Sequence, residues 1–145
     1  AKSPHSFLGI DEHGQTCIVN TTGNGLAHLI LRGGRSGPNF SAKHVQKAAQ
    51  AMVDAGLKPN IVVDCSHANS NKNHELQIPA FQDVLLQRVE GNTNIIGMML
   101  QSNLLAALKY GVSITDACID WDQTEALLRE AHVAMSQVLG QTADA

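Results

Sequence analysis

The sequence predicts an α/β fold in which a parallel sheet is covered by helices and preceded by a β-hairpin. Three runs of strand length are apolar almost throughout, as in strands that are buried on both faces of a parallel sheet. Each run is followed, directly or after a loop, by a segment with helical periodicity, and this alternation is typical of βα units. The chain has 145 residues, of which 43% are hydrophobic and 16% charged, so it can bury the core of one domain.

The first expected elements are the hairpin and one βα unit. Residues 6–10 and 15–20 are β-prone and flank a polar turn, which predicts two antiparallel strands. A strand is expected over 27–32, where an apolar run is ended by two glycines. Ser41 is a suitable N-cap for a helix over 41–55. A polar, glycine-rich loop therefore separates this strand from its helix.

Two further βα units follow. Strands are expected over 60–64 and 94–100, and each is followed by polar residues. Helices are expected over 78–90 and 121–139, with Asp120 as the N-cap of the second. Because βα crossovers are right-handed, the three strands should lie parallel and adjacent, with the helices on one side.

Composition and charge exclude several classes of protein. Lys and Arg number 10 against 13 Asp and Glu, so the net charge of -3 gives no bulk attraction to nucleic acid or to an anionic membrane. No apolar run approaches the ~18 residues of a membrane span, and the first residues lack the pattern of a signal peptide. The 3 cysteines form no CxxC pair, so we expect reduced thiols and a cytoplasmic protein.

Polar residues follow all of the predicted parallel strands, at the carboxyl ends where α/β sheets gather functional groups. Arg32 ends the first strand, Asp64 and His67 follow the second, and Gln101 follows the third. A further polar cluster lies at 113–116. We therefore expect one cleft that is lined by these residues.

Arg32 and His67 are the candidate functional residues of that cleft, and each has a structural alternative. A guanidinium beside two glycines can hold a carboxylate or phosphate through two parallel hydrogen bonds, or it can pair with a carboxylate of the protein itself. His67 and Asp116 would offer nitrogen and oxygen ligands to a divalent metal, or His67 can be a loop residue held by hydrogen bonds. Cys65 has no second Cys/His pair to complete a zinc site, so we expect it to be a small buried residue.

Five longer motifs identify a resemblance to a known family. They are NTTGNG (20–25), LRGG (31–34), PNFS (38–41), DCSHANS (64–70) and SITDACI (113–119). In this order and with small gaps, the chain resembles the C-terminal part of the type I DAHP synthases that are regulated by aromatic amino acids. The match runs nearly from end to end.

The resemblance implies part of a (β/α)₈ barrel, since a complete barrel takes roughly 200–250 residues. Residues 1–145 would form a single partial-barrel domain, with a hairpin insertion over 1–24 and about three parallel βα units over 25–145. The family condenses phosphoenolpyruvate with erythrose 4-phosphate, giving DAHP and phosphate, in the shikimate pathway of aromatic amino acid biosynthesis. This transferase is metal-dependent, so a divalent cation (Mn²⁺, Fe²⁺ or similar) is the expected cofactor.

The resemblance also implies roles for individual residues. Arg32 would bind phosphoenolpyruvate. His67 would bind the metal beside that substrate, so both are expected catalytic and substrate-binding residues. Asp116 would be a second metal ligand. Phe7 and Val19 match positions of a feedback-inhibitor pocket, although the simpler interpretation is that Phe7 packs the hairpin on the barrel.

Two features depart from the family's pattern. Gln101 and Asn103 stand where the family has Glu and His, and an amide holds a hard divalent cation more weakly than a carboxylate does. The matched part of the barrel also lacks the metal-ligating Cys and most of the residues that bind the two phosphates. We therefore expect weakened metal binding and an isolated chain without activity. The alternative is a non-catalytic half-barrel that serves as an oligomerising or anion-binding module.

A partial barrel leaves two sheet edges and its interior face uncovered. The candidates for that face are Leu29, Leu31, Val62 and Met98. Unpaired edges and a large apolar surface favour association with another chain. We therefore expect either a homo-oligomer or a complex with the missing N-terminal part of the barrel.

Overall fold

The computed structural model describes residues 2–102 and 117–143, and it contains two separate sheets. The strands are β1 (Ser6–Ile10), β2 (Thr16–Asn20), β3 (Leu29–Leu31), β4 (Ile61–Asp64) and β5 (Ile95–Met99). The helices are α1 (Ala42–Asp54), α2 (Gln77–Val89) and α3 (Trp121–Ala143), with the 3₁₀ turns η1 (His67–Ser70) and η2 (His74–Leu76) between β4 and α2. Every predicted helix and strand is present within a few residues of its expected range.

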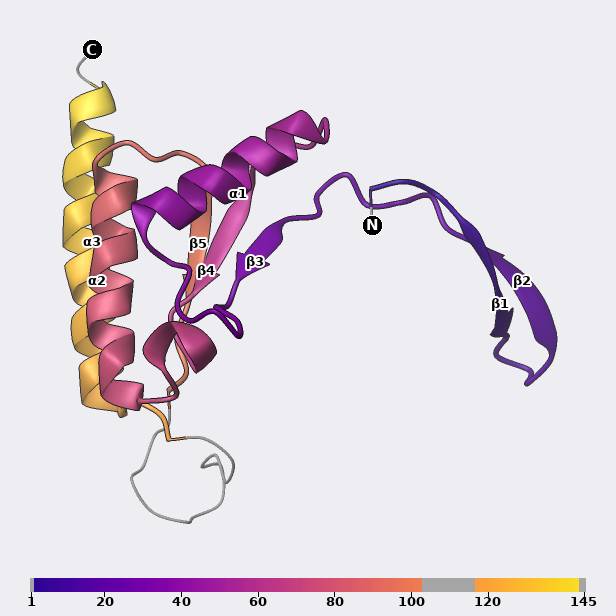
Figure 1. Ribbon diagram of the computed structural model, residues 1–145, viewed down its shortest axis with the longest axis horizontal. Helices are drawn as coiled ribbons and strands as arrows, with labels where there is room; N and C mark the ends of the chain where they lie inside the picture. The colour runs from indigo at the N-terminus through magenta and orange to yellow at the C-terminus, as the bar shows by residue number, and fades with distance from the viewer. Residues whose placement is uncertain (1, 103–116, 144–145) are drawn as a thin grey trace.

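Strands β3, β4 and β5 form one parallel sheet in that order, as predicted. Figure 1 shows α1 crossing the sheet, with α2 and α3 packed side by side next to it. Strand β3 is shorter than expected because β4, its partner, begins only at Ile61. The carboxyl ends of the three strands therefore meet at one edge of the sheet.

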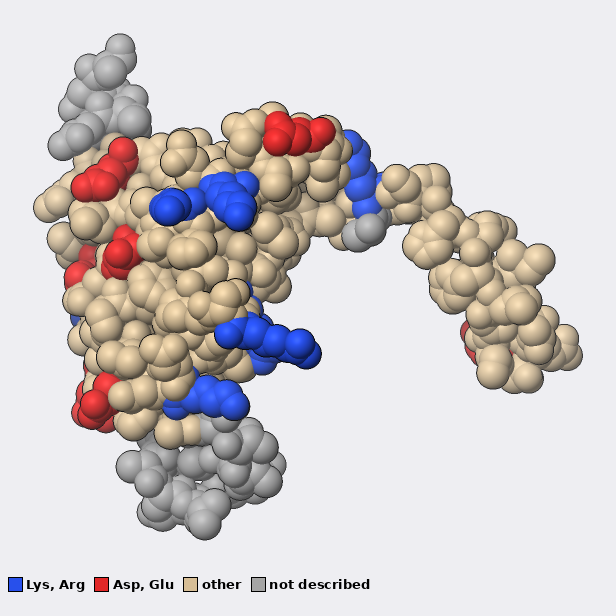
Figure 2. All heavy atoms as spheres, in the orientation of Figure 1, with Lys and Arg blue, Asp and Glu red and all other residues tan. Residues whose placement is uncertain are grey.

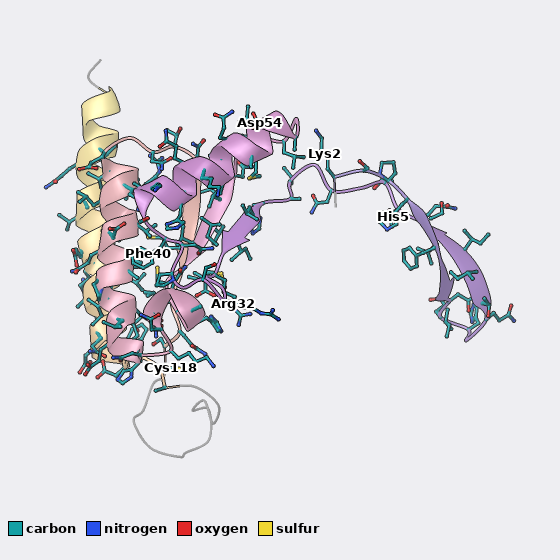
Figure 3. The ribbon with its side chains drawn as sticks, in the orientation of Figure 1. Lys2, His5, Arg32, Phe40, Asp54 and Cys118 are labelled. Carbon is teal, nitrogen blue, oxygen red and sulfur yellow. The ribbon has the colours of Figure 1, made fainter. Side chains whose placement is uncertain are left out.

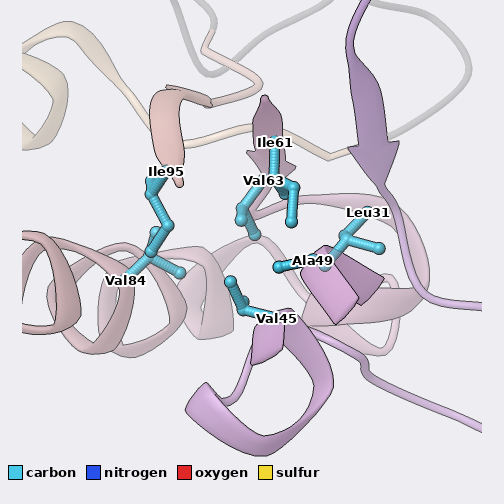
Figure 4. Close-up of a cluster of buried hydrophobic side chains, with 7 residues drawn as sticks. All are labelled: Leu31, Val45, Ala49, Ile61, Val63, Val84 and Ile95. Atoms are coloured by element: carbon cyan, nitrogen blue, oxygen red, sulfur yellow. The ribbon is translucent and has the colours of Figure 1, made fainter. Parts of the chain in front are cut away.

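The hydrophobic core lies between the sheet and the helices. Val45 of α1 and Val84 of α2 are completely buried against Ile61 and Val63 of the central strand. Figure 4 shows these side chains converging from the two layers. Burial of each such aliphatic side chain contributes about 1.5–3 kcal/mol, so this layer fixes the helices on one face of the sheet.

The opposite face of the sheet is uncovered by the described residues. Ile30, Val62 and Gly97 are register partners on this face, which we call the open face. Ile30 is 45% exposed, and Ile96 and Met99 of the edge strand are 53% and 43% exposed. Such a row of exposed aliphatic side chains is unusual for a monomer surface.

The predicted composition of the open face was right for Val62 and wrong for the other candidates. Leu31 and Met98 pack against the helices, because they alternate with the residues of the open face. Leu29 shares the helix side with Leu31, at the edge of the sheet. When a strand is apolar on both faces, its sequence does not show which of its residues face the helices.

The hairpin of β1 and β2 projects away from the rest of the chain, as Figure 1 shows. Its turn is held by Asp11, whose Oδ1 accepts hydrogen bonds from the backbone N–H of His13 at 2.9 Å and of Gln15 at 2.8 Å. Lys2 donates from Nζ to the carbonyl of Gly56 at 2.8 Å, so the base of the hairpin contacts the helical layer. Within the described residues, no helix has the length and apolar character that crossing a membrane requires.

Candidate active site

The candidate site lies at the carboxyl ends of the parallel strands. Arg32 follows β3, Asp64 is the last residue of β4, His67 begins η1, and Gln101 follows β5. A cavity of about 260 Å³ opens there, and its lining residues are Arg32, His67, Ser70, Lys72, His74, Gln77, Gln101 and Ala117. The structure thus brings Arg32, His67 and Gln101 together around one cavity. Asp116 and Asn103 lie outside the described residues.

Asp64 is a buried carboxylate beneath this cavity. Its side chain is 3% exposed. Oδ1 accepts hydrogen bonds from the Ser66 backbone N–H at 2.9 Å and from Ser66 Oγ at 2.5 Å. Oδ2 lies 2.8 Å from His67 Nδ1 and 3.7 Å from Arg32 Nε. These contacts compensate the cost of burying the charge.

His67 is held against Asp64 by the backbone and by its ring. Its φ of 55° is in the left-handed region, which is uncommon for a residue other than glycine, and this turns the chain back toward the end of β4. Nδ1 also lies 2.7 Å from Ser66 Oγ. The ring is 29% exposed and lines the cavity. The predicted alternative, a loop histidine fixed by hydrogen bonds, and the predicted role as a ligand both agree with this geometry.

Arg32 combines one internal contact with a large exposed surface. Its Nε faces Asp64, and its side chain is 61% exposed. Figure 3 shows this side chain reaching away from the sheet, and Figure 2 shows Lys and Arg side chains, in blue, projecting from the surface on the side that faces the hairpin. An ion pair at 3.7 Å with one exposed partner contributes little to stability. The contact orients the guanidinium while leaving much of its surface accessible to an anion.

Two asparagines tie the Arg32 loop to the His67 loop. Asn69 is buried, and its Nδ2 donates to the carbonyls of Leu31 at 3.1 Å and Asp64 at 2.7 Å, so one side chain joins the ends of β3 and β4. Its Oδ1 accepts from the Asn39 backbone N–H at 2.7 Å, and Asn39 Oδ1 accepts from the Gly33 N–H at 2.7 Å. This chain of hydrogen bonds fixes the loops that carry both candidate residues.

Gln77 fixes the end of the third strand in the same way. Its side chain is 1% exposed. Oε1 accepts from the Gln101 backbone N–H at 2.8 Å, and Nε2 donates to the Gln101 carbonyl at 3.2 Å. Both backbone groups of Gln101 are therefore satisfied by one residue of α2. Sequence reasoning did not single out Gln77 or Asn69, because a lone amide in a polar segment gives no signal of burial.

Positive charge dominates the cavity. Arg32 and Lys72 are cations there, and the rings of His67 and His74 add nitrogen donors, whereas the neighbouring carboxylate of Asp64 is buried and engaged internally. This arrangement suits a small anion.

Cys65 is a buried core residue, as expected. Its exposed fraction is 0%, and it packs among residues of α2 and α3. Burial, with a smaller contribution from the adjacent Asp64 charge, raises the pKa of the Cys65 thiol to about 12. The thiol is therefore protonated at neutral pH, which disfavours its reaction as a nucleophile.

Two of the described cavity residues have side chains that could ligate a metal. They contain no group of three or more His, Cys, Asp or Glu side chains that could hold an ion. His67 fits ligation well, because a carboxylate on Nδ1 is the usual support of a metal-binding imidazole. Gln101 can add one amide oxygen at the same cavity. These two donors fit two positions of a coordination shell.

The predicted regulatory residues, Phe7 and Val19, lie on the hairpin and not at the cavity. Phe7 and Val19 are directly opposite each other across the hairpin, and Phe7 is 48% exposed. Figure 1 shows the hairpin well separated from the strand ends. The expectation that Phe7 packs the hairpin on the barrel was wrong, because the hairpin projects away from the sheet and helices and Phe7 pairs with Val19 instead. The regulatory role of both residues stays a prediction.

Comparisons with known proteins show which family this chain resembles. The model of the DAHP synthetase I family matches residues 1–129. The Tyr-sensitive phospho-2-dehydro-3-deoxyheptonate aldolase of Salmonella typhimurium is 44% identical over 94% of this chain and 41% of its own length. The Phe-sensitive aldolase of Escherichia coli is 45% identical over 90% of this chain and 39% of its own length.

A solved structure shows the same arrangement. It is that of the phospho-2-dehydro-3-deoxyheptonate aldolase of Francisella tularensis, with a TM-score of 0.86 and 40% identity, over 92% of this chain and 41% of the other. The chain thus spans about two fifths of the length of these relatives. The family model covers most of the chain, and several relatives exceed 40% identity. This protein therefore belongs to the DAHP synthetase I family.

Proposed function

We propose that this chain forms the C-terminal part of the active site of a DAHP synthase, which condenses phosphoenolpyruvate with erythrose 4-phosphate. One observation carries the proposal: Arg32, His67 and Lys72 line one cavity at the strand ends of a chain from this family. The relatives are named as phospho-2-dehydro-3-deoxyheptonate aldolases, and this name describes the product of that condensation.

In this proposal the residues of the cavity have distinct roles. Arg32 binds the phosphate or carboxylate of phosphoenolpyruvate, because Asp64 holds its Nε while most of the side chain is exposed. His67 contacts the same substrate and offers Nε2 to a metal, since its Nδ1 is engaged by Asp64. Gln101 and Asp116 would be further ligands. A bound divalent cation would act as a Lewis acid on the aldehyde of the second substrate.

The proposed architecture is a single partial (β/α)₈ barrel domain with a hairpin insertion. The parallel order β3–β4–β5, the helices on one face and the open face on the other support it. In a barrel the open face would be the interior, and Ile30 and Val62 would pack there. Cys17 and Cys65 are thiols, which supports a location in the reducing cytoplasm.

The open face requires a partner in this proposal. Its occupant is the N-terminal part of a DAHP synthase barrel, or a second copy of this chain that supplies equivalent strands. Light scattering with a hydrophobic dye tests this statement. We expect association or dye binding for the chain alone, and a clean 15.5 kDa monomer without dye binding would contradict it.

We further propose that the isolated chain binds phosphoenolpyruvate without catalysing the condensation. Gln101 lowers the charge of the metal site, and the described cations are too few to hold two phosphorylated substrates. The second candidate function, a non-catalytic anion-binding module, is favoured by this same incomplete donor set. An assay of phosphate release distinguishes the two candidates when the N-terminal part of a family member is added as a separate chain. Release that requires both substrates supports the synthase, and no release supports the anion-binding module.

Calorimetric titration tests the binding site directly. Phosphoenolpyruvate should bind with a Kd on the order of 1 mM, corresponding to about 4 kcal/mol, and added salt should weaken it. Arg32→Ala should weaken binding by at least about tenfold, whereas Arg35→Ala, an exposed arginine of the same loop outside the cavity lining, should not. Equal effects of both variants would contradict the proposed site.

Metal binding has its own test. Mn²⁺ should bind the unmodified chain weakly, and Gln101→Glu should tighten it by adding a charged oxygen at the cavity. Gln46→Glu adds the same charge on the exposed side of α1, outside the cavity lining, and should leave Mn²⁺ affinity unchanged. Tight stoichiometric binding of Mn²⁺ by the unmodified chain would refute the idea that Gln101 weakens the metal site.

A further inference from the structure

We propose that Asp64 is a positioning residue that sets the ring tautomer of His67 and orients the guanidinium of Arg32 at the same time. The inference rests on the proposed function for the roles of Arg32 and His67. It concerns a residue that does not line the cavity and that the proposed function does not place in contact with substrate or metal. Its basis is that one buried carboxylate contacts both functional side chains.

The two oxygens of Asp64 have separate tasks. Oδ1 takes both hydrogen bonds from Ser66, one from the backbone N–H and one from the hydroxyl. Oδ2 is left for His67 Nδ1 at 2.8 Å and Arg32 Nε at 3.7 Å. Ser66 therefore fixes the orientation of the carboxylate, and the carboxylate in turn faces the two functional groups.

This pattern assigns the proton on the ring of His67. An ionised carboxylate accepts hydrogen bonds and cannot donate them, so Nδ1 must carry the hydrogen in the contact with Oδ2. The Ser66 hydroxyl donates to Oδ1 and so accepts from the same Nδ1. In the neutral ring Nε2 consequently bears the lone pair, which is the form that can ligate a metal or accept a proton.

Two energetically unfavourable features accompany these contacts. Burying a carboxylate is costly, and a backbone amide or a neutral side chain could have satisfied Ser66 at lower cost. His67 adopts a positive φ of 55°, a conformation that costs on the order of 1 kcal/mol, and it brings the ring onto Asp64 rather than into the core. Both unfavourable features bring two cavity-lining side chains to a single anchor.

The first test measures the tautomer in the protein as it exists. Nitrogen-15 NMR of the His67 ring, in mildly alkaline buffer without metal, should show a protonated Nδ1 and a lone pair on Nε2. His44, whose Nδ1 lies 2.8 Å from the hydroxyl of Ser41, serves as an internal comparison without a carboxylate partner. A wild-type spectrum with the proton on Nε2 of His67 would overturn the proposal without any variant.

The second test uses Asp64→Asn, which preserves shape and removes the charge. We expect the His67 ring to change to the Nε2-protonated tautomer and phosphoenolpyruvate affinity to fall on the order of tenfold. Asp54→Asn, in the last turn of α1 and bonded to Gln50, is the matched control and should change neither. A folded Asp64→Asn chain with an unchanged tautomer and unchanged affinity would refute the positioning role.

A third variant covers the case in which Asp64→Asn fails to fold. Ser66→Ala keeps the carboxylate and removes one of its hydrogen bonds, so the Nδ1-protonated tautomer should persist with a weaker ligand affinity. Loss of that tautomer in Ser66→Ala would assign the ring orientation to Ser66 and contradict the proposal. The tautomer of His67 is measured without ligand and does not depend on phosphoenolpyruvate binding. A chain that binds no phosphoenolpyruvate would therefore refute the proposed function, whereas the NMR result would still test the effect of Asp64 on His67.

Discussion

Replacement of Gly33 by alanine tests the contact between the Arg32 loop and the His67 loop. Gly33 has a φ of +74°, and a Cβ built on it would lie 2.8 Å from the backbone carbon of Ala68, 2.8 Å from Ala68 Cβ and 2.9 Å from the backbone nitrogen of Asn69. Because two of these atoms belong to the backbone of η1, no side-chain rotation relieves the overlap. The loop or η1 must move.

The expected cost follows from two separate contributions. A Cβ in the left-handed region costs roughly 1–2 kcal/mol, and overpacking against a fixed neighbour costs roughly 1–3 kcal/mol. Gly33→Ala should therefore lower the free energy of unfolding by about 2–5 kcal/mol. Since η1 begins at His67, the variant should also weaken phosphoenolpyruvate binding.

Two neighbouring glycines separate these contributions. Gly37 has a φ of +104°, and no atom lies within 4 Å of the place that a Cβ would occupy, so Gly37→Ala should cost only the roughly 1–2 kcal/mol of backbone strain. Gly34 has neither feature, and Gly34→Ala should lie within about 0.5 kcal/mol of wild type or be slightly stabilising. Urea unfolding followed by circular dichroism measures all three. If Gly33→Ala costs no more than Gly37→Ala, the close approach to η1 is refuted.

Two further predictions concern buried polar groups. Gln77→Ala should cost about 1–3 kcal/mol, because the Gln101 N–H loses its partner and the Gln101 carbonyl keeps only the N–H of Ile119. Gln46→Ala, on the exposed side of α1, should cost less than about 0.5 kcal/mol, and equal losses in urea unfolding would contradict this. For Cys65, the folded pKa of about 12 exceeds the ordinary 9.0, so the unfolded chain loses its proton first as pH rises. The contribution of the Cys65 thiol to stability should therefore be fully present below pH 9.0 and be lost as the pH rises toward about 12. The stability of Cys65→Ala should decline less steeply over that interval, and parallel pH profiles of unfolding would refute the buried thiol.

The sequence pattern predicts the elements of this fold well because their signals are local. Continuous apolar runs mark β4 and β5, and the cap at Asp120 marks the start of α3, where its Oδ1 accepts from the Gln123 N–H at 2.8 Å. The helix α3 extends beyond its predicted end, because Gly140 lies within it instead of ending it. A single glycine costs a helix only about 1 kcal/mol relative to alanine, so it is a weak helix terminator.

Orientation and anchoring could not be predicted in the same way. Leu31 and Val62 are equally apolar, so only the pairing register shows that they lie on opposite faces of the sheet. Asp64 is adjacent to the predicted site residues, yet its burial depends on Ser66 and His67 folding back over it. The positions of Arg32 and His67 followed from a general rule about strand ends, whereas the residues that hold them depend on individual hydrogen bonds.

Those anchoring residues explain how part of a site can form on a sheet of three parallel strands. Asn69 joins the ends of β3 and β4, Gln77 holds the end of β5, and Asp64 links Arg32 to His67. All these contacts lie within the three strands, their following loops and α2, so every group that makes them belongs to the described part of this chain. Substrate affinity and turnover, in contrast, depend on the number of cations and metal ligands, which add up from every strand of a complete site. The structure therefore leads us to expect a preformed anion site without catalysis, and the binding and phosphate-release measurements address these two properties separately.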